Sequence, residues 1–146
     1  MKFFIKLNTI SALYALALFL AIELIINVYR ISDITGWDWD HVYFIIAIIN
    51  VIGLLLSTLI FITLTRKWMI GSKHSYWPLI LWLPYFILLF AIIRGLLPIQ
   101  FGDTLFPRYS LLIIGSSLLF PVYILFINVY ASPLRIDEDD VPEGRF

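Results

Sequence analysis

The chain has 146 residues, no cysteine, a formal net charge of zero and a hydrophobic fraction of 62%. This composition lies outside the range of soluble domains and indicates an integral membrane protein. The lack of cysteine excludes disulfides and thiolate chemistry, and the balanced charge gives no reason to expect nucleic acid as a ligand.

Four apolar stretches make up most of the chain, at about residues 8–29, 41–64, 77–98 and 109–131. About 20 apolar residues in a helix cross a hydrocarbon core of roughly 30 Å. We therefore predict an all-α fold: an integral membrane four-helix bundle with short loops, formed by residues 1–132. The remaining residues, 133–146, are predicted to be a disordered acidic tail.

The first span contains Glu23, with Asn27 one helical turn later, and the second span contains Asn50. An ionised side chain in the membrane is costly unless it is paired or neutralised. Asparagine in a membrane helix bonds to a neighbouring helix or lines a wet cavity, and bonding between helices is the commoner use.

The third span contains Arg94. Glu23 and Arg94 lie about 22 and about 25 Å along two helices that run in the same direction, at 1.5 Å per residue. They are therefore predicted to pair at the same depth, the alternative being an arginine that extends to the interface on its long stem. Ser116 and Ser117 of the fourth span complete a candidate polar layer, which is either structural or functional.

Two charged segments outside the spans are candidate docking sites for lipid or for a protein partner. The loop after the second span carries three basic residues beside Trp68, a composition suited to an anionic membrane surface. The tail carries a dense acidic run that can bind a basic surface. These candidate docking residues are Arg66, Lys67 and Lys73 in the loop, and Asp137, Glu138, Asp139 and Asp140 in the tail.

The distribution of lysine and arginine predicts the orientation of the chain. Seven of these residues lie in the N-terminus, the second loop and the tail, namely Lys2, Lys6, Arg66, Lys67, Lys73, Arg135 and Arg145. Only Arg30, Arg94 and Arg108 lie near the opposite side. Because basic loops stay in the cytoplasm, both termini are predicted to be cytoplasmic, in a bacterial plasma (inner) membrane.

No stretch of the sequence matches a catalytic, cofactor or metal-binding motif, and His41 with Asp38 and Asp40 lacks the spacing of a ligand set. We expect no cofactor and no enzymatic activity. The leading hypothesis is a small membrane subunit, an anchor or sensor that recruits a cytosolic partner, for example in immunity, phage defence or transporter assembly. Its expected partners are the lipid bilayer, further copies of the chain in a homo-oligomer, and this cytosolic protein. The alternative is a homo-oligomeric channel or transporter. An intramembrane enzyme is the third hypothesis, and it lacks a positioned nucleophile.

Overall fold

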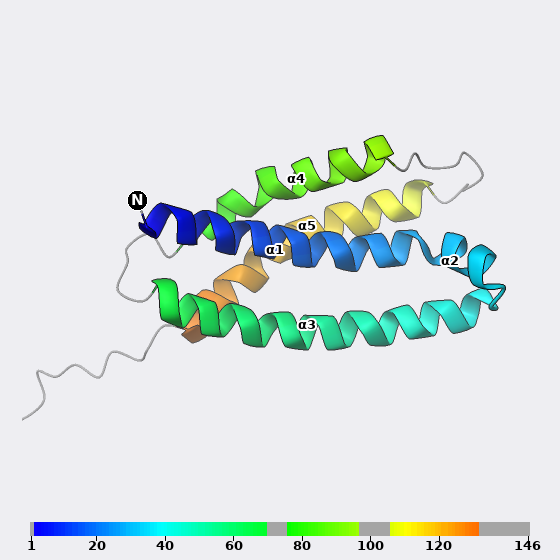
Figure 1. The fold of residues 1–146 in the computed structure, drawn as a ribbon, viewed down its shortest axis with the longest axis horizontal. Helices are drawn as coiled ribbons and strands as arrows, with labels where there is room; N and C mark the ends of the chain where they lie inside the picture. Colours follow the sequence, from blue (N-terminus) through cyan, green and yellow to red (C-terminus); the bar gives the residue numbers. More distant parts are fainter. Residues whose placement is uncertain (1, 70–75, 97–105, 132–146) are drawn as a thin grey trace, which may run out of the picture.

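A computed structural model describes residues 2–69, 76–96 and 106–131 of the chain, all within or next to helices. Four helices are long and apolar enough to cross a membrane, so the fold is the predicted all-α four-helix membrane bundle (Figure 1). A short helix joins the first two of them. The helices are α1 (Lys2–Ile26), α2 (Val28–Thr35), α3 (Trp39–Met69), α4 (Pro78–Leu96) and α5 (Phe106–Ala131).

The helix bounds depart from the predicted spans mainly in α1 and α3. α3 has 31 residues, which at 1.5 Å per residue is about 45 Å, well beyond a hydrocarbon core of roughly 30 Å. Its apolar span runs from Trp39 to Trp68. Because indole rings favour the headgroup region, this helix extends through both interfaces.

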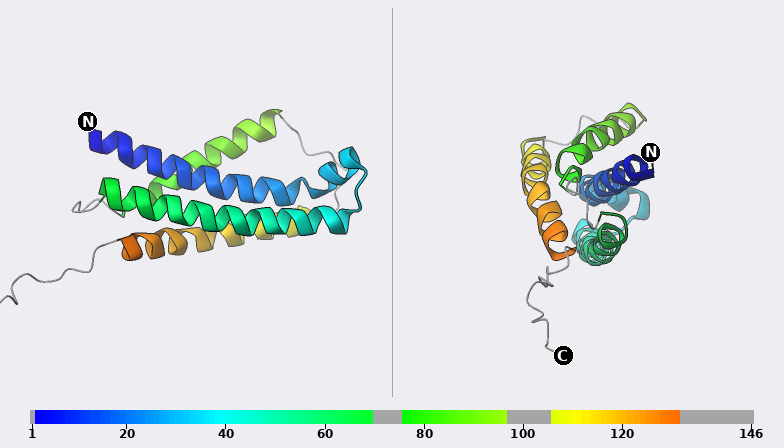
Figure 2. Two further views of the ribbon diagram at one scale, coloured as in Figure 1. Left: turned by 60° about the horizontal axis from the view of Figure 1, so that its bottom comes forward. Right: turned by 90° about the vertical axis from the view of Figure 1, so that its left-hand side faces the viewer.

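The four long helices form a ring in which α1 packs against α4 and α3, and α5 closes the ring against α3 and α4. α1 also contacts α5 across the ring (Figure 2). About a third of the α1 span is buried in the protein, 33%, against 11% to 17% of the other spans. α1 is therefore the central helix of the bundle.

The bundle has two ends that the following paragraphs distinguish. At the Lys6 end, α1 and α4 begin and α3 and α5 finish (Figure 1). At the Gly36 end, α1 leads through α2 into α3. α3 and α5 lie together at the Lys6 end and diverge toward the other end (Figure 1).

An aromatic cluster joins all four long helices. The Tyr14 ring of α1 lies on Phe61 of α3, with ring centroids 4.1 Å apart, and meets the edge of Phe120 of α5 at 6.1 Å. Phe120 in turn meets Trp82 of α4 at 5.0 Å. Because lipid is as apolar as these side chains, close packing and edge contacts rather than exclusion of water hold the helices together here.

Asn27 separates α1 from α2. Its side-chain Nδ2 donates to the Glu23 carbonyl at 2.8 Å, the same oxygen that accepts its backbone N–H at 3.0 Å. Such a local side-chain bond competes with the helical hydrogen-bond ladder and bends it. The apolar stretch that begins in α1 is therefore interrupted at Asn27. The polar helix α2 follows, with Arg30 three residues after Asn27.

Candidate functional site

Glu23 and Arg94 form an ion pair that joins α1 to α4. The Arg94 Nη2 donates to Glu23 Oε1 at 2.8 Å, and the two side chains are only 18% and 13% exposed, respectively. The two helices run in the same direction from the Lys6 end, so the two residues reach the same depth. The structure thus places the two charges in contact as the sequence predicted.

The second carboxylate oxygen of Glu23 is also occupied. It accepts a hydrogen bond from Asn27 Nδ2 at 2.9 Å. On the other side of the pair, the Arg94 guanidinium lies 4.9 Å from the centroid of the Phe90 ring, within the range of a cation–π contact. Arg94 Nε is buried and has no hydrogen-bond partner in the described part of the chain.

This geometry determines what the Glu23 cluster, formed by Glu23, Asn27 and Arg94, can do chemically. Each Glu23 oxygen accepts a bond from a side chain of the protein, so the carboxylate is held in place between Asn27 and Arg94. Pairing also reduces the cost of placing both charges in the membrane. The arrangement suits a structural role in which the ion pair fixes α1 against α4.

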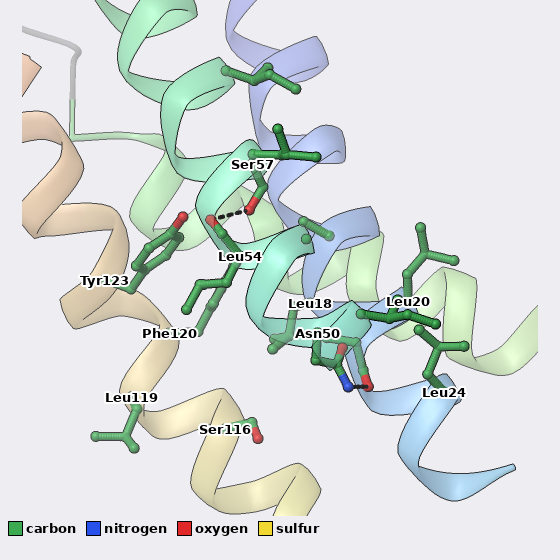
Figure 3. Close-up of a pocket in the computed structure, with 16 residues that line it drawn as sticks. Leu18, Leu20, Leu24, Asn50, Leu54, Ser57, Ser116, Leu119, Phe120 and Tyr123 are labelled. Atoms are coloured by element: carbon green, nitrogen blue, oxygen red, sulfur yellow. Dashed lines mark hydrogen bonds between the residues drawn. The ribbon is translucent and has the colours of Figure 1, made fainter. Parts of the chain in front are cut away.

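Asn50 and Ser116 lie apart from the Glu23 cluster, at a cavity of about 530 Å³ bounded by α1, α3 and α5 (Figure 3). Small side chains on two helices leave this space open, Ala17 and Ala21 on α1 and Gly53 on α3. The volume falls within the range of about 300–1,000 Å³ that is typical of small-molecule sites.

The polar groups of the cavity are engaged mostly with the backbone. Asn50 Nδ2 donates to the Ala21 carbonyl in a long bond of 3.5 Å, which links α3 to α1. Ser57 donates to the Leu54 carbonyl of its own helix at 3.0 Å (Figure 3). The predicted polar layer is therefore divided in two, and Ser117, half-buried on α5, does not line this cavity.

Several buried polar residues nearer the Lys6 end were missed by the sequence prediction. Ser11, Tyr14, Thr65 and Asn128 are all at most 4% exposed. Neither Tyr14 Oη nor Asn128 Nδ2 has a hydrogen-bond partner among the described residues. Asn128 carried the same signal as Asn50, an amide within an apolar span, and could have been predicted from that signal.

Two hydrogen bonds between helices were also missed. Tyr85 of α4 donates to Asn8 Oδ1 of α1 at 2.7 Å, and the hydroxyl groups of Thr58 on α3 and Tyr123 on α5 are 2.7 Å apart. Each bond satisfies a phenol that would otherwise lose its partner in lipid. A tyrosine within a span does not by itself predict such a bond, because its apolar ring is sufficient reason for a tyrosine at that position.

Two basic residues at the Lys6 end lie over aromatic rings. Lys6 Nζ lies 5.9 Å from the Trp68 ring centroid, and the Arg66 guanidinium lies 5.8 Å from that of Tyr130. Lys67 is exposed. We call Lys6, Arg66 and Lys67 the basic face. The other predicted docking residues, Lys73, Asp137, Glu138, Asp139 and Asp140, lie outside the described residues.

The described acidic residues have a different location. Asp33, Asp38 and Asp40 lie at the Gly36 end, where His41 Nδ1 is 3.8 Å from Asp38 and both side chains are highly exposed. Within residues 2–69, 76–96 and 106–131, no group of three or more His, Cys, Asp or Glu side chains could hold a metal ion.

Comparisons with known proteins do not identify a family or a function for this chain. No protein-family model, no curated protein and no solved structure matches this chain.

Proposed function

We propose that this chain is a small, non-enzymatic membrane subunit that recruits a cytosolic protein to the membrane through its basic face. A cluster of basic residues at one end of the bundle is the observation that carries the proposal. At the Lys6 end, Lys6, Arg66 and Lys67 lie together without a described carboxylate. The other charges are mixed in sign, because Arg30 lies close to Asp33 at the Gly36 end and Arg94 is paired with Glu23. A protein with an acidic surface would be steered to such a face.

The same cluster of basic residues supports a cytoplasmic location for the Lys6 end. Basic side chains close to the ends of spans are retained in the cytoplasm. Placing the Lys6 end there makes both termini cytoplasmic and exposes the basic face to soluble partners. A bacterial plasma membrane is the proposed location.

The Glu23 cluster supports a structural role for the charges inside the membrane. Both carboxylate oxygens bond to side chains of the protein, so the most conspicuous acid in the spans serves to connect α1 with α4. This leaves the basic face, with Lys73 and the acidic residues 137–140, as the proposed working surface.

The test compares two double variants of the full chain purified from native membranes in a mild detergent. Lys6→Gln with Lys67→Gln removes two charges from the basic face, and Asp33→Asn with Asp38→Asn removes two charges from the Gly36 end as the control. A soluble protein that co-purifies in a fixed ratio should be lost from the first variant, retained by the second, and released from the unaltered chain by high salt. A partner retained equally by both variants would refute the proposal.

A homo-oligomeric channel or transporter is the second candidate. The cavity between α1, α3 and α5, with Asn50 and Ser116 on its lining, is the observation in its favour. Against it, a channel would need polar residues such as Glu23 and Asn27 to face water, whereas these two are bonded to each other and Glu23 is bonded to Arg94.

A further inference from the structure

Arg66 bridges α3 and α5 at the Lys6 end. Its Nη2 donates to the Tyr130 carbonyl in a long bond of 3.5 Å, while its guanidinium lies over the Tyr130 ring. That carbonyl belongs to the last turn of α5, where carbonyl oxygens lack intrahelical partners. The bond uses one of the five N–H donors of the guanidinium, which is exposed at the level where the apolar span finishes.

On both helices, exposed apolar side chains lie on the membrane side of Arg66, toward the middle of the bundle. On α3, Leu59 and Leu55 precede Arg66 by seven and eleven residues, which places all three on one side of the helix. On α5, Phe126 and Val122 precede Tyr130 at spacings of four and eight residues. Leu59 is 63% exposed and Phe126 68% exposed.

The length of this surface matches one leaflet of a bilayer. The distance along α3 from Arg66 to Leu55 is about 16 Å at 1.5 Å per residue, and a leaflet is about half of the roughly 30 Å hydrocarbon core. A cation with an aromatic ring therefore lies above two apolar stripes that extend to the middle of the membrane. We call this surface the α3–α5 seam; it consists of Leu55, Leu59, Arg66, Val122, Phe126 and Tyr130.

Charge complementarity identifies the headgroup that fits this seam. The described residues at the Lys6 end include no carboxylate side chain. The planar guanidinium fork matches phosphate geometry and is less strongly hydrated than an ammonium group. An anionic phosphate above an alkyl chain complements both parts of the seam.

We propose that the α3–α5 seam binds an anionic phospholipid, with its phosphate on Arg66 and one acyl chain along Leu59 and Phe126. Arg66 also belongs to the basic face to which the proposed function assigns a cytosolic protein, but the lipid site does not depend on that function, because its test measures bound lipid alone. The lipid would join the ends of α3 and α5, which lie close together at the Lys6 end (Figure 1).

The experiment uses the full chain in nanodiscs of equal amounts of phosphatidylglycerol and phosphatidylcholine, followed by native mass spectrometry of the lipids that stay bound. The unaltered chain should retain phosphatidylglycerol in preference to phosphatidylcholine. Arg66→Gln should lower this preference about ten-fold, the effect of losing one direct hydrogen bond between charged groups. Arg66→Lys, which keeps the charge, should retain most of it.

Lys67→Gln is the matched control, because it removes the same charge from the adjacent residue, which points in a different direction around α3. Its preference for phosphatidylglycerol should stay within two-fold of the unaltered chain. Equal losses in Arg66→Gln and Lys67→Gln, or equal retention of the two lipids by the unaltered chain, would overturn the proposal. A preference that emerges only after truncation at Pro133 would also overturn it, because the acidic tail would then be the occupant of Arg66.

Discussion

At the scale of single residues, the cost of burying charge explains the most polar part of the membrane domain. Glu23 and Arg94 are each expensive alone in a low-dielectric region, and their contact at 2.8 Å makes both tolerable. Asn27 adds a third group by bonding the remaining carboxylate oxygen. The Glu23 cluster therefore connects α1 to α4 through one ion pair, and the Asn27 bond orients the carboxylate.

Breaking this pair should destabilise the bundle. Glu23→Gln and Arg94→Gln should each lower the free energy of unfolding by about 1.5–3 kcal/mol, the usual range for a hydrogen bond to a charged group. The double variant should recover part of the loss, since neither charge is then left without its partner. Unfolding in detergent measures all three, with Arg30→Gln as the control. Strictly additive losses would contradict the coupling.

At the scale of the elements, the connection from α1 to α3 depends on Asn27 and Gly36. Gly36 follows α2 with a φ of 68°, in the left-handed region, and its N–H donates to the Ser32 carbonyl at 2.9 Å. Glycine adopts this conformation without the clash that a Cβ would cause within its own backbone. The chain can thus leave α2 and enter α3 within a few residues.

Replacing Gly36 tests this role. Gly36→Ala should lower the free energy of unfolding by about 1–2 kcal/mol, the cost of a left-handed conformation for a residue with a Cβ. Apart from Gly36 and its two chain neighbours, no residue has an atom within 4 Å of the position of an added Cβ, so the loss would come from the backbone conformation and not from contact with the rest of the protein. Gly36→Asn should lose less, because asparagine tolerates this region. Equal thermal stability of the alanine and glycine proteins would rule out this account.

The sequence predicted the spans well because their signal is local. Twenty apolar residues in a row need no knowledge of neighbouring segments, and the depth of Glu23 and Arg94 follows from counting residues along two helices. The division of the polar layer could not be predicted in this way. Whether Asn50 faces the Glu23 cluster or the cavity depends on how each helix is rotated about its axis, which packing with all its neighbours determines.

At the scale of the whole molecule, charge is distributed by depth rather than spread over the surface. The Lys6 end combines the basic face with the C-termini of α3 and α5, whose negative dipole ends favour nearby cations. The aromatic cluster lies in the middle of the bundle. The Glu23 cluster connects α1 to α4. Surface chemistry that a soluble partner could recognise is therefore concentrated at the two ends, and the proposed function assigns it to the Lys6 end.

Photocrosslinking in living cells tests the recruitment of a cytosolic protein most directly. A benzophenone amino acid placed at Lys67 should crosslink the chain to one cytosolic protein, and the same group at Thr35, at the Gly36 end, should not. Crosslinking from Lys67 should disappear when Lys6 is also changed to Gln. Crosslinks from Lys67 that join only copies of this chain, or a soluble partner captured from Thr35 instead, would contradict the account.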